Sequence, residues 1–208
     1  MGSVLGRAVQ SSAAVIRVTY AVRWCGTQQV IGSSFRSAYP GDFSGRDPSL
    51  EDLHLEINQQ YSSFKIPARA KYLILAGDVG RFPDYHAFRD FIRQLTTRFE
   101  LVFLVLENHE FYNGTFAAGL GLKKAKQLER DPLLDGRLVI LHRKRYDIPG
   151  TRVSILGCTV WSAVPHHLRG IVQAKVKDFK RIEGWTVDDH NAHHKFDILS
   201  PLSAGVDA

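Results

Sequence analysis

The chain has 208 residues and a formal net charge of +6, and hydrophobic residues make up 44% of it against 23% charged residues. This size and composition favour one folded domain, and they argue against a chain that is disordered throughout or spans a membrane. Cys25 and Cys158 are the only cysteines, which excludes a disulfide framework or a cysteine-rich zinc module. A modest positive charge suits an anionic substrate, although it is more often only a solvated surface.

The first 49 residues differ in composition from the rest of the chain. Residues 1–41 contain four arginines and no acidic residue, and they are rich in Ser, Ala and Val. Such an amino-terminal segment is typical of a mitochondrial transit peptide, and the alternative is an irregular leader without a targeting signal. Because residues 40–49 are turn-forming, we predict an irregular leader over 1–49 and a folded domain over 50–208. The expected location is the cytoplasm, or the mitochondrion if the leader is a transit peptide.

From residue 50 onward the sequence alternates between strand and helix patterns. Short apolar runs predict buried strands at 71–76, 101–106, 137–142 and 152–157. A helix is predicted after Asp84, which can cap it, and a weaker one is predicted around 115–129. Residues 168–198 are expected to form one or two further helices. Alternating strands and helices are the signature of an α/β fold.

Polar residues follow the first two predicted strands, where an open α/β sheet places its ligand site. Asp78 follows the first strand, and Asn108 and His109 follow the second. Asp52 and His54 precede both, and an extended Asp-x-His segment points its two side chains the same way. A carboxylate and an imidazole form half of a site for Zn²⁺, Mn²⁺ or Fe²⁺. Asp78 can bridge two cations, Asn108 adds an amide oxygen, and His109 can donate a proton to a leaving group.

Each of these clusters also has a purely structural interpretation. Asp-x-His pairs are commonly surface residues, Gly-Asp after a strand is commonly a turn, and Asn-His can cap the next helix. His142, His166 and His167 are expected to be exposed or structural. The three clusters together favour a site over three separate surface features.

The ordered set Asp52-x-His54, Gly77-Asp78 and Asn108-His109-Glu110 resembles the calcineurin-like metallophosphoesterases. Two further stretches, residues 156–162 and 185–191, resemble a fungal-type branch of that superfamily. The resemblance covers about residues 50–197. It implies a β-sandwich of two sheets flanked by helices, of which this chain holds a part. It also implies a phosphoester hydrolase that uses a two-metal mechanism, in which a metal-bound hydroxide attacks phosphorus.

The resemblance implies a role for each candidate residue. Asp52 and His54 would bind the first of two divalent ions (Mn, Fe, Zn or Mg), and Asp78 would bridge both. Asn108 would bind the second ion, and His109 would protonate the leaving oxygen. The expected partner is a phosphate ester, and neither a membrane nor nucleic acid is expected as a partner.

The sequence departs from the family pattern in three places. Glu107 stands where the family has Gly, and Pro48 argues against the strand expected before Asp52. The later His and the Gly-His-x-His motif of the family do not follow Asp197, so the domain is expected to be incomplete at its carboxyl end.

The missing motif has two consequences for the prediction. The histidines at 190, 193 and 194 are expected to lie on a helix surface rather than to replace it. Unpaired sheet edges would make the chain marginally stable or self-associating. An inactive remnant that keeps the first half of the fold and acts by binding therefore stays as the alternative to a hydrolase.

Overall fold

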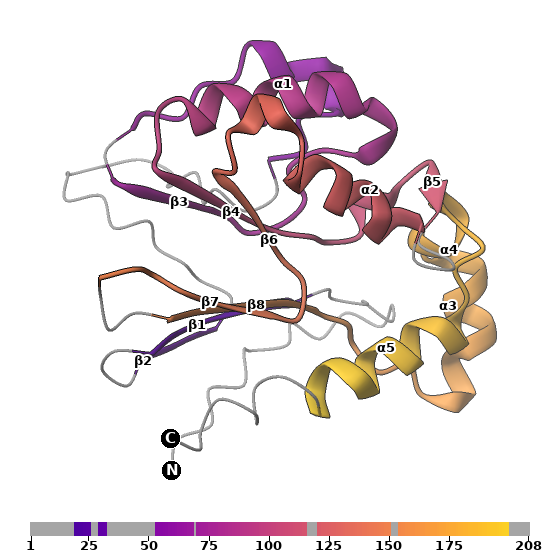
Figure 1. The fold of residues 1–208 in the computed structure, drawn as a ribbon. Helices are drawn as coiled ribbons and strands as arrows, with labels where there is room; N and C mark the ends of the chain where they lie inside the picture. Colours follow the sequence, from indigo (N-terminus) through magenta and orange to yellow (C-terminus); the bar gives the residue numbers. More distant parts are fainter. Residues whose placement is uncertain are drawn as a thin grey trace, which may run out of the picture.

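The computed structural model describes residues 19–25, 29–32, 53–68, 70–115, 120–150 and 154–199. Helices and both parallel and antiparallel sheets alternate along this part of the chain, which confirms the predicted α/β fold (Figure 1). None of its helices is both long and apolar enough to cross a bilayer.

A three-stranded parallel sheet forms the centre of the molecule. Its strands are β3 (Tyr72–Leu75), β4 (Leu101–Val105) and β6 (Leu138–Leu141), with β4 in the middle. The crossovers contain α1 (Tyr85–Thr96) and α2 (Leu120–Glu129), and both helices lie over the same face of the sheet (Figure 1). These strands match the predicted apolar runs, because strands covered on both faces need side chains that are apolar on both sides.

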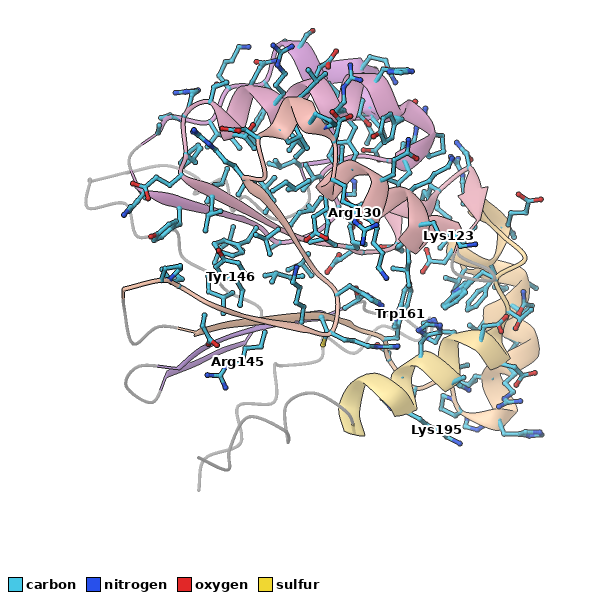
Figure 2. The ribbon with its side chains drawn as sticks, viewed as in Figure 1. Lys123, Arg130, Arg145, Tyr146, Trp161 and Lys195 are labelled. Carbon is cyan, nitrogen blue, oxygen red and sulfur yellow. The ribbon has the colours of Figure 1, made fainter. Side chains whose placement is uncertain are left out.

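A second sheet, entirely antiparallel, packs below the first (Figure 1). Its strand order is β2 (Gln29–Gly32), β1 (Thr19–Cys25), β8 (Ser154–Val160) and β7 (Lys144–Asp147). Phe103 and Leu141 of the central sheet pack against Ile155 of β8, and Figure 2 shows Tyr146 in the space between the sheets. A Cβ at Gly157 would lie 2.6 Å from Cβ of Leu141, so the close approach of the two sheets requires glycine there.

Short helices lie between the longer elements, and further helices make up most of the carboxyl-terminal part of the chain. The 3-10 helices are η1 (Ile57–Ser62), η2 (Phe82–Asp84), η3 (His109–Phe111), η5 (Pro132–Leu134) and η6 (His166–Leu168). They are joined by α3 (Arg169–Lys175), α4 (Asp178–Arg181) and α5 (Val187–Leu199). The two-residue strands β5 (Gly114–Thr115) and β9 (Ile182–Glu183) pair in parallel and attach α4 to the segment after β4.

The structure differs from the predicted irregular leader over residues 1–49. Strands β1 and β2 lie within that range, and β1 pairs along the length of β8 from Thr19–Val160 to Cys25–Ser154. The Thr, Tyr, Val and Trp residues of β1 have high strand propensity, which fits this pairing. The domain boundary, the targeting role of the leader and the self-association of the chain stay predictions.

Three local expectations are also corrected. The segment 168–198 contains three helices rather than one or two. Asp84 precedes α1 without a capping hydrogen bond, because its carboxylate instead accepts from Arg81 Nε at 2.6 Å. His190, expected on a helix surface, is fully buried against Trp161 (Figure 2) and Trp185. The sequence neighbours of His190 are mostly polar and suggested an exposed position. The aromatic rings that surround it meet it only in the folded chain.

Candidate metal centre

His54, Asp78 and His109 come together beyond the carboxyl ends of β3 and β4. Each offers one ligand atom, and the three atoms all lie within 4.8 Å of one another. The two strands are neighbours and parallel, so the residues that follow them meet at one edge of the sheet. The structure thus brings together three of the five predicted site residues.

The backbone at two of these residues takes a conformation that side chains disfavour. His54 has φ 47° and Asp78 has φ 50°, both in the left-handed region. They are joined directly, because the His54 N–H donates to the Asp78 carbonyl at 2.8 Å. The extended Asp-x-His geometry expected from the sequence is therefore wrong at His54. Residues held in sparsely populated backbone regions cluster at functional sites.

Gly77 has no side chain, and this allows the loop after β3 to lie close to the loop after β4. Its φ is +100°, and a Cβ there would lie 2.3 Å from Cγ of Glu107. Glu107, which stands where the family pattern has Gly, is buried and does not have a positive φ. Of positions 77 and 107, the one that needs glycine is therefore 77, and the side chain of Glu107 fills the space next to it.

Glu110 ties these two loops together from inside the core. Its fully buried carboxylate accepts backbone N–H bonds from four residues: Asp78 (3.3 Å), Val79 (2.8 Å), Gly80 (3.4 Å) and Glu107 (2.7 Å). Burial and the neighbouring Asp78 carboxylate raise the pKa of Glu110 to about 8, although the N–H donors oppose this shift. Glu110 therefore fixes the backbone on which Asp78 and His109 stand.

Glu56 faces both imidazoles of the cluster. Its Oε1 lies 2.7 Å from Nδ1 of His109 and 3.5 Å from Nδ1 of His54, and its side chain is 9% exposed. Burial alone would raise the pKa of Glu56, but its hydrogen bonds with the two histidines outweigh this and hold the pKa well below its usual range. A carboxylate beside two imidazoles gives the cluster a set of donors that can attract a cation.

Asn108 takes part in a separate hydrogen-bond network. Its Nδ2 donates to Asp178 Oδ1 at 2.9 Å and to the Tyr112 hydroxyl at 3.1 Å, and that hydroxyl donates to the same Asp178 oxygen at 2.5 Å. Burial and the hydrogen bond to Asp178 raise the pKa of Tyr112 far above its usual range. The two partners fix the amide nitrogen of Asn108 and leave its carbonyl oxygen for another ligand.

The donor set fits a divalent metal ion. Imidazole and carboxylate ligands suit Zn²⁺, Mn²⁺ and Fe²⁺, whose bonds of about 2.1 Å place two ligand atoms up to about 4.2 Å apart. Small side-chain rotations would bring atoms within 4.8 Å to that range. Glu56 Oε2 is buried and has no hydrogen-bond partner among the residues that the structure describes, so it is a further oxygen that a bound cation could satisfy.

The sequence predictions of individual site residues have different outcomes. Asp52 lies outside the described residues, and its role as a ligand stays a prediction. His109, predicted to protonate the leaving oxygen, also contributes an atom to the candidate metal group. Asn108 lies next to His109 in sequence but makes its described contacts with Tyr112 and Asp178.

Sequence reasoning missed three carboxylates that support the cluster. Glu56 follows His54 by two residues and Glu110 follows His109 directly, so their proximity to the motifs was a usable signal. Asp178 lies 70 residues from Asn108, and no spacing pattern links the two. Asp178 begins α4, and the pairing of β5 with β9 joins the end of that helix to the segment after β4.

The chain resembles known proteins at low sequence identity. No protein-family model matches the chain. An uncharacterized protein of Acanthamoeba polyphaga mimivirus is 24% identical over 160 residues, which are 68% of this chain and 56% of that protein. The chain therefore spans little more than half the length of this curated relative. The crystal structure of phosphopantetheinyl hydrolase (PptH) from Mycobacterium tuberculosis matches with a TM-score of 0.46 and 17% identity, over 76% of this chain and 62% of that one.

Proposed function

We propose that the chain is a metal-dependent phosphoester hydrolase of the calcineurin-like metallophosphoesterase type. One observation carries this proposal: His54, Asp78 and His109, from three separate segments, place their ligand atoms within 4.8 Å of one another. The left-handed backbone at His54 and Asp78 supports it, because the fold holds both residues in a costly conformation.

The proposed chemistry divides between a cation and the residues of the chain. A bound divalent ion would polarise a phosphoryl oxygen and stabilise the charge that develops in hydrolysis. His54 and Asp78 would hold the ion, and Asp52 stays a proposed further ligand. His109 would hold the proton that the leaving oxygen takes, and Asn108 would present its amide oxygen to a second ion or to the phosphate. Mn²⁺, Fe²⁺, Zn²⁺ and Mg²⁺ are the candidate ions.

The test is hydrolysis of p-nitrophenyl phosphate and of its bis ester by the purified chain, with EDTA or with each candidate metal. We expect Mn²⁺-dependent activity in the original chain and a loss of at least about 100-fold in Asp78→Asn. Asp135→Asn is the matched control, because the Asp135 side chain is 78% exposed and has φ 53°, which asparagine also tolerates.

Each outcome of this test has a defined meaning. Activity that persists in EDTA, or that survives Asp78→Asn, contradicts the proposed site. A folded chain without activity contradicts hydrolysis and favours the alternative, a remnant that acts by binding. Calorimetric titration with Mn²⁺ then shows whether the cluster still binds metal, and Asp78→Asn should remove that heat.

A further inference from the structure

A basic segment lies beside the candidate metal centre. Residues 165–181 contain five Lys or Arg residues and one acidic residue, Asp178. Asp178 is buried, whereas Lys177 and Arg181, on either side of it in sequence, are exposed. Neither of these two cations makes an ion pair with a residue that the structure describes. Within the described part of the chain, their charges are therefore available to an anion from solution.

Two contacts hold α4 against the loop after β4, which carries Asn108 and His109. Asp178 Oδ1 lies 2.9 Å from Nδ2 of Asn108. The Asn113 N–H donates to the Arg181 carbonyl at 2.7 Å, and β5 pairs with β9 directly after these residues (Figure 1). The first and the last residue of α4 therefore both contact the loop of the candidate site.

The helical turn of α4 determines which of its cations lies nearest to that site. The Arg181 N–H donates to the Lys177 carbonyl at 2.9 Å, so these two residues are neighbours on one side of the turn. Arg181 follows Asp178 by three residues, and Cβ atoms at this spacing are about 5–6 Å apart. Lys180 follows Asp178 by two residues, and helical residues at that spacing do not face each other. Arg181, with Lys177 beside it, therefore lies next to the contact between Asp178 and Asn108.

We propose that Lys177 and Arg181 bind a second phosphate group of the substrate, so that the chain prefers small esters that carry two phosphates. The inference rests on the proposed function, which places the first phosphate at the metal centre. A guanidinium matches a phosphate with two parallel N–H groups, and an ammonium adds a point charge. Two cations on one helical turn fit a single phosphate group, whereas a nucleic acid needs cations along its whole backbone. No bond forms or breaks at the second phosphate.

The first test compares two chromogenic esters that differ by one phosphate: thymidine 5′-(p-nitrophenyl phosphate) with and without a 3′-phosphate. In both, water adds to the 5′ phosphorus, the bond to the p-nitrophenyl oxygen breaks, and the released p-nitrophenol is measured. With Mn²⁺ we expect kcat/KM to be at least about tenfold higher for the 3′-phosphorylated ester. The preference should shrink at high salt, because salt screens exposed charges. Equal values for the two esters overturn the proposal.

Variants of α4 then test whether the two cations cause the preference. Lys177→Gln and Arg181→Gln should each lower the ratio of the two kcat/KM values by at least about threefold. Lys180→Gln is the matched control, because Lys180 is an exposed lysine on another side of the same turn, and it should keep the ratio within about twofold. A ratio that survives both substitutions together, or that Lys180→Gln lowers equally, overturns the role of Lys177 and Arg181.

A binding measurement separates this inference from the proposed hydrolase. Calorimetric titration of the metal-free chain with thymidine 3′,5′-bisphosphate requires neither catalysis nor a metal ion. The chain with both Lys177→Gln and Arg181→Gln should bind at least about tenfold more weakly than the original chain or Lys180→Gln. If neither ester is hydrolysed, the hydrolase is contradicted and this titration decides alone. Binding that only the double variant weakens supports the second-phosphate site, and binding that is absent or equal in all three chains overturns it.

Discussion

Two groups of histidines lie in different surroundings within this molecule. His54 and His109 are partly exposed and face the carboxylate of Glu56 at the edge of the central sheet. His190 on α5 is fully buried among Trp161 and Trp185, and its Nε2 donates to the Ser162 carbonyl at 2.7 Å. The first group has access to solvent and hydrogen-bonding contact with a carboxylate, whereas the ring of His190 is enclosed and bonds to a backbone carbonyl.

The comparison shows what separates a chemical role from a structural one. Burial lowers the pKa of His190 and keeps it neutral, so the ring serves as an aromatic side chain with one hydrogen bond. His109 has a negative partner at one nitrogen and a neighbouring imidazole and carboxylate in the metal group. Removing a ring from the first group should therefore affect activity, and removing one from the second should affect stability.

The largest effect is expected for His109→Ala. Loss of the imidazole removes both a proposed proton donor and a ligand, so metal-dependent hydrolysis should fall by at least about 100-fold. The free energy of unfolding should change by no more than about 1 kcal/mol, because the side chain is partly exposed. Phosphatase assays measure the loss of hydrolysis, and urea unfolding measures the change in the free energy of unfolding. A large loss of stability with activity per folded molecule preserved would reverse the assignment.

His190→Ala should show the opposite pattern. Removing a fully buried ring leaves a cavity and an unpaired Ser162 carbonyl, which should lower the free energy of unfolding by about 3 kcal/mol. Metal affinity should stay within about twofold. His167→Ala, at an exposed position in η6, controls for the loss of a histidine. A His190→Ala chain as stable as this control would argue against the structural role.

His142 gives a smaller effect that sharpens the contrast. Burial and the positive charges of Arg143, His193 and Lys126 lower its pKa to about 4, against an ordinary value of 6.5. Between pH 6.5 and pH 4, His142 therefore binds a proton in the unfolded chain but not in the folded chain. The stability contribution is complete above pH 6.5 and is lost as the pH falls to 4, by about 1–2 kcal/mol for this partly exposed ring.

Urea unfolding of the original chain and of His142→Gln at pH 7.5 and at pH 4.5 measures this effect. The glutamine variant should lose less stability on acidification, by the same amount of about 1–2 kcal/mol. His167→Gln again controls for removing one histidine. Equal acid sensitivity in all three chains would show that His142 titrates in the same way in the folded and unfolded states.

The central sheet is the part of the fold that the sequence predicts best. The run that forms β4 is apolar throughout, because Val102 and Leu104 face the helices whereas Phe103 and Val105 face the second sheet. A strand that needs apolar residues on both faces shows this need in its own local sequence. The pairing of β1 with β8 could not be predicted in this way, because it joins residues 129 (Cys25–Ser154) to 141 (Thr19–Val160) positions apart.

The candidate site was predictable to a similar extent. Asp78 and His109 follow neighbouring parallel strands, so their meeting at one edge follows from the α/β pattern. The conformation of His54 was not predictable from spacing, because its left-handed backbone depends on the hydrogen bond to the Asp78 carbonyl. The burial of His190 was hidden for the same reason, since its aromatic neighbours come from other segments.

The sequence by itself determined the strands of the central sheet and the residue types at their carboxyl ends, because both are set by local hydrophobicity and chain direction. Only the tertiary structure decided which carboxylate supports which ligand. Glu56 contacts His109 across 53 positions and Asp178 contacts Asn108 across 70. Hydrogen bonds of this kind act over about 3 Å, so they depend on how the loops are packed and leave no periodic trace in the sequence.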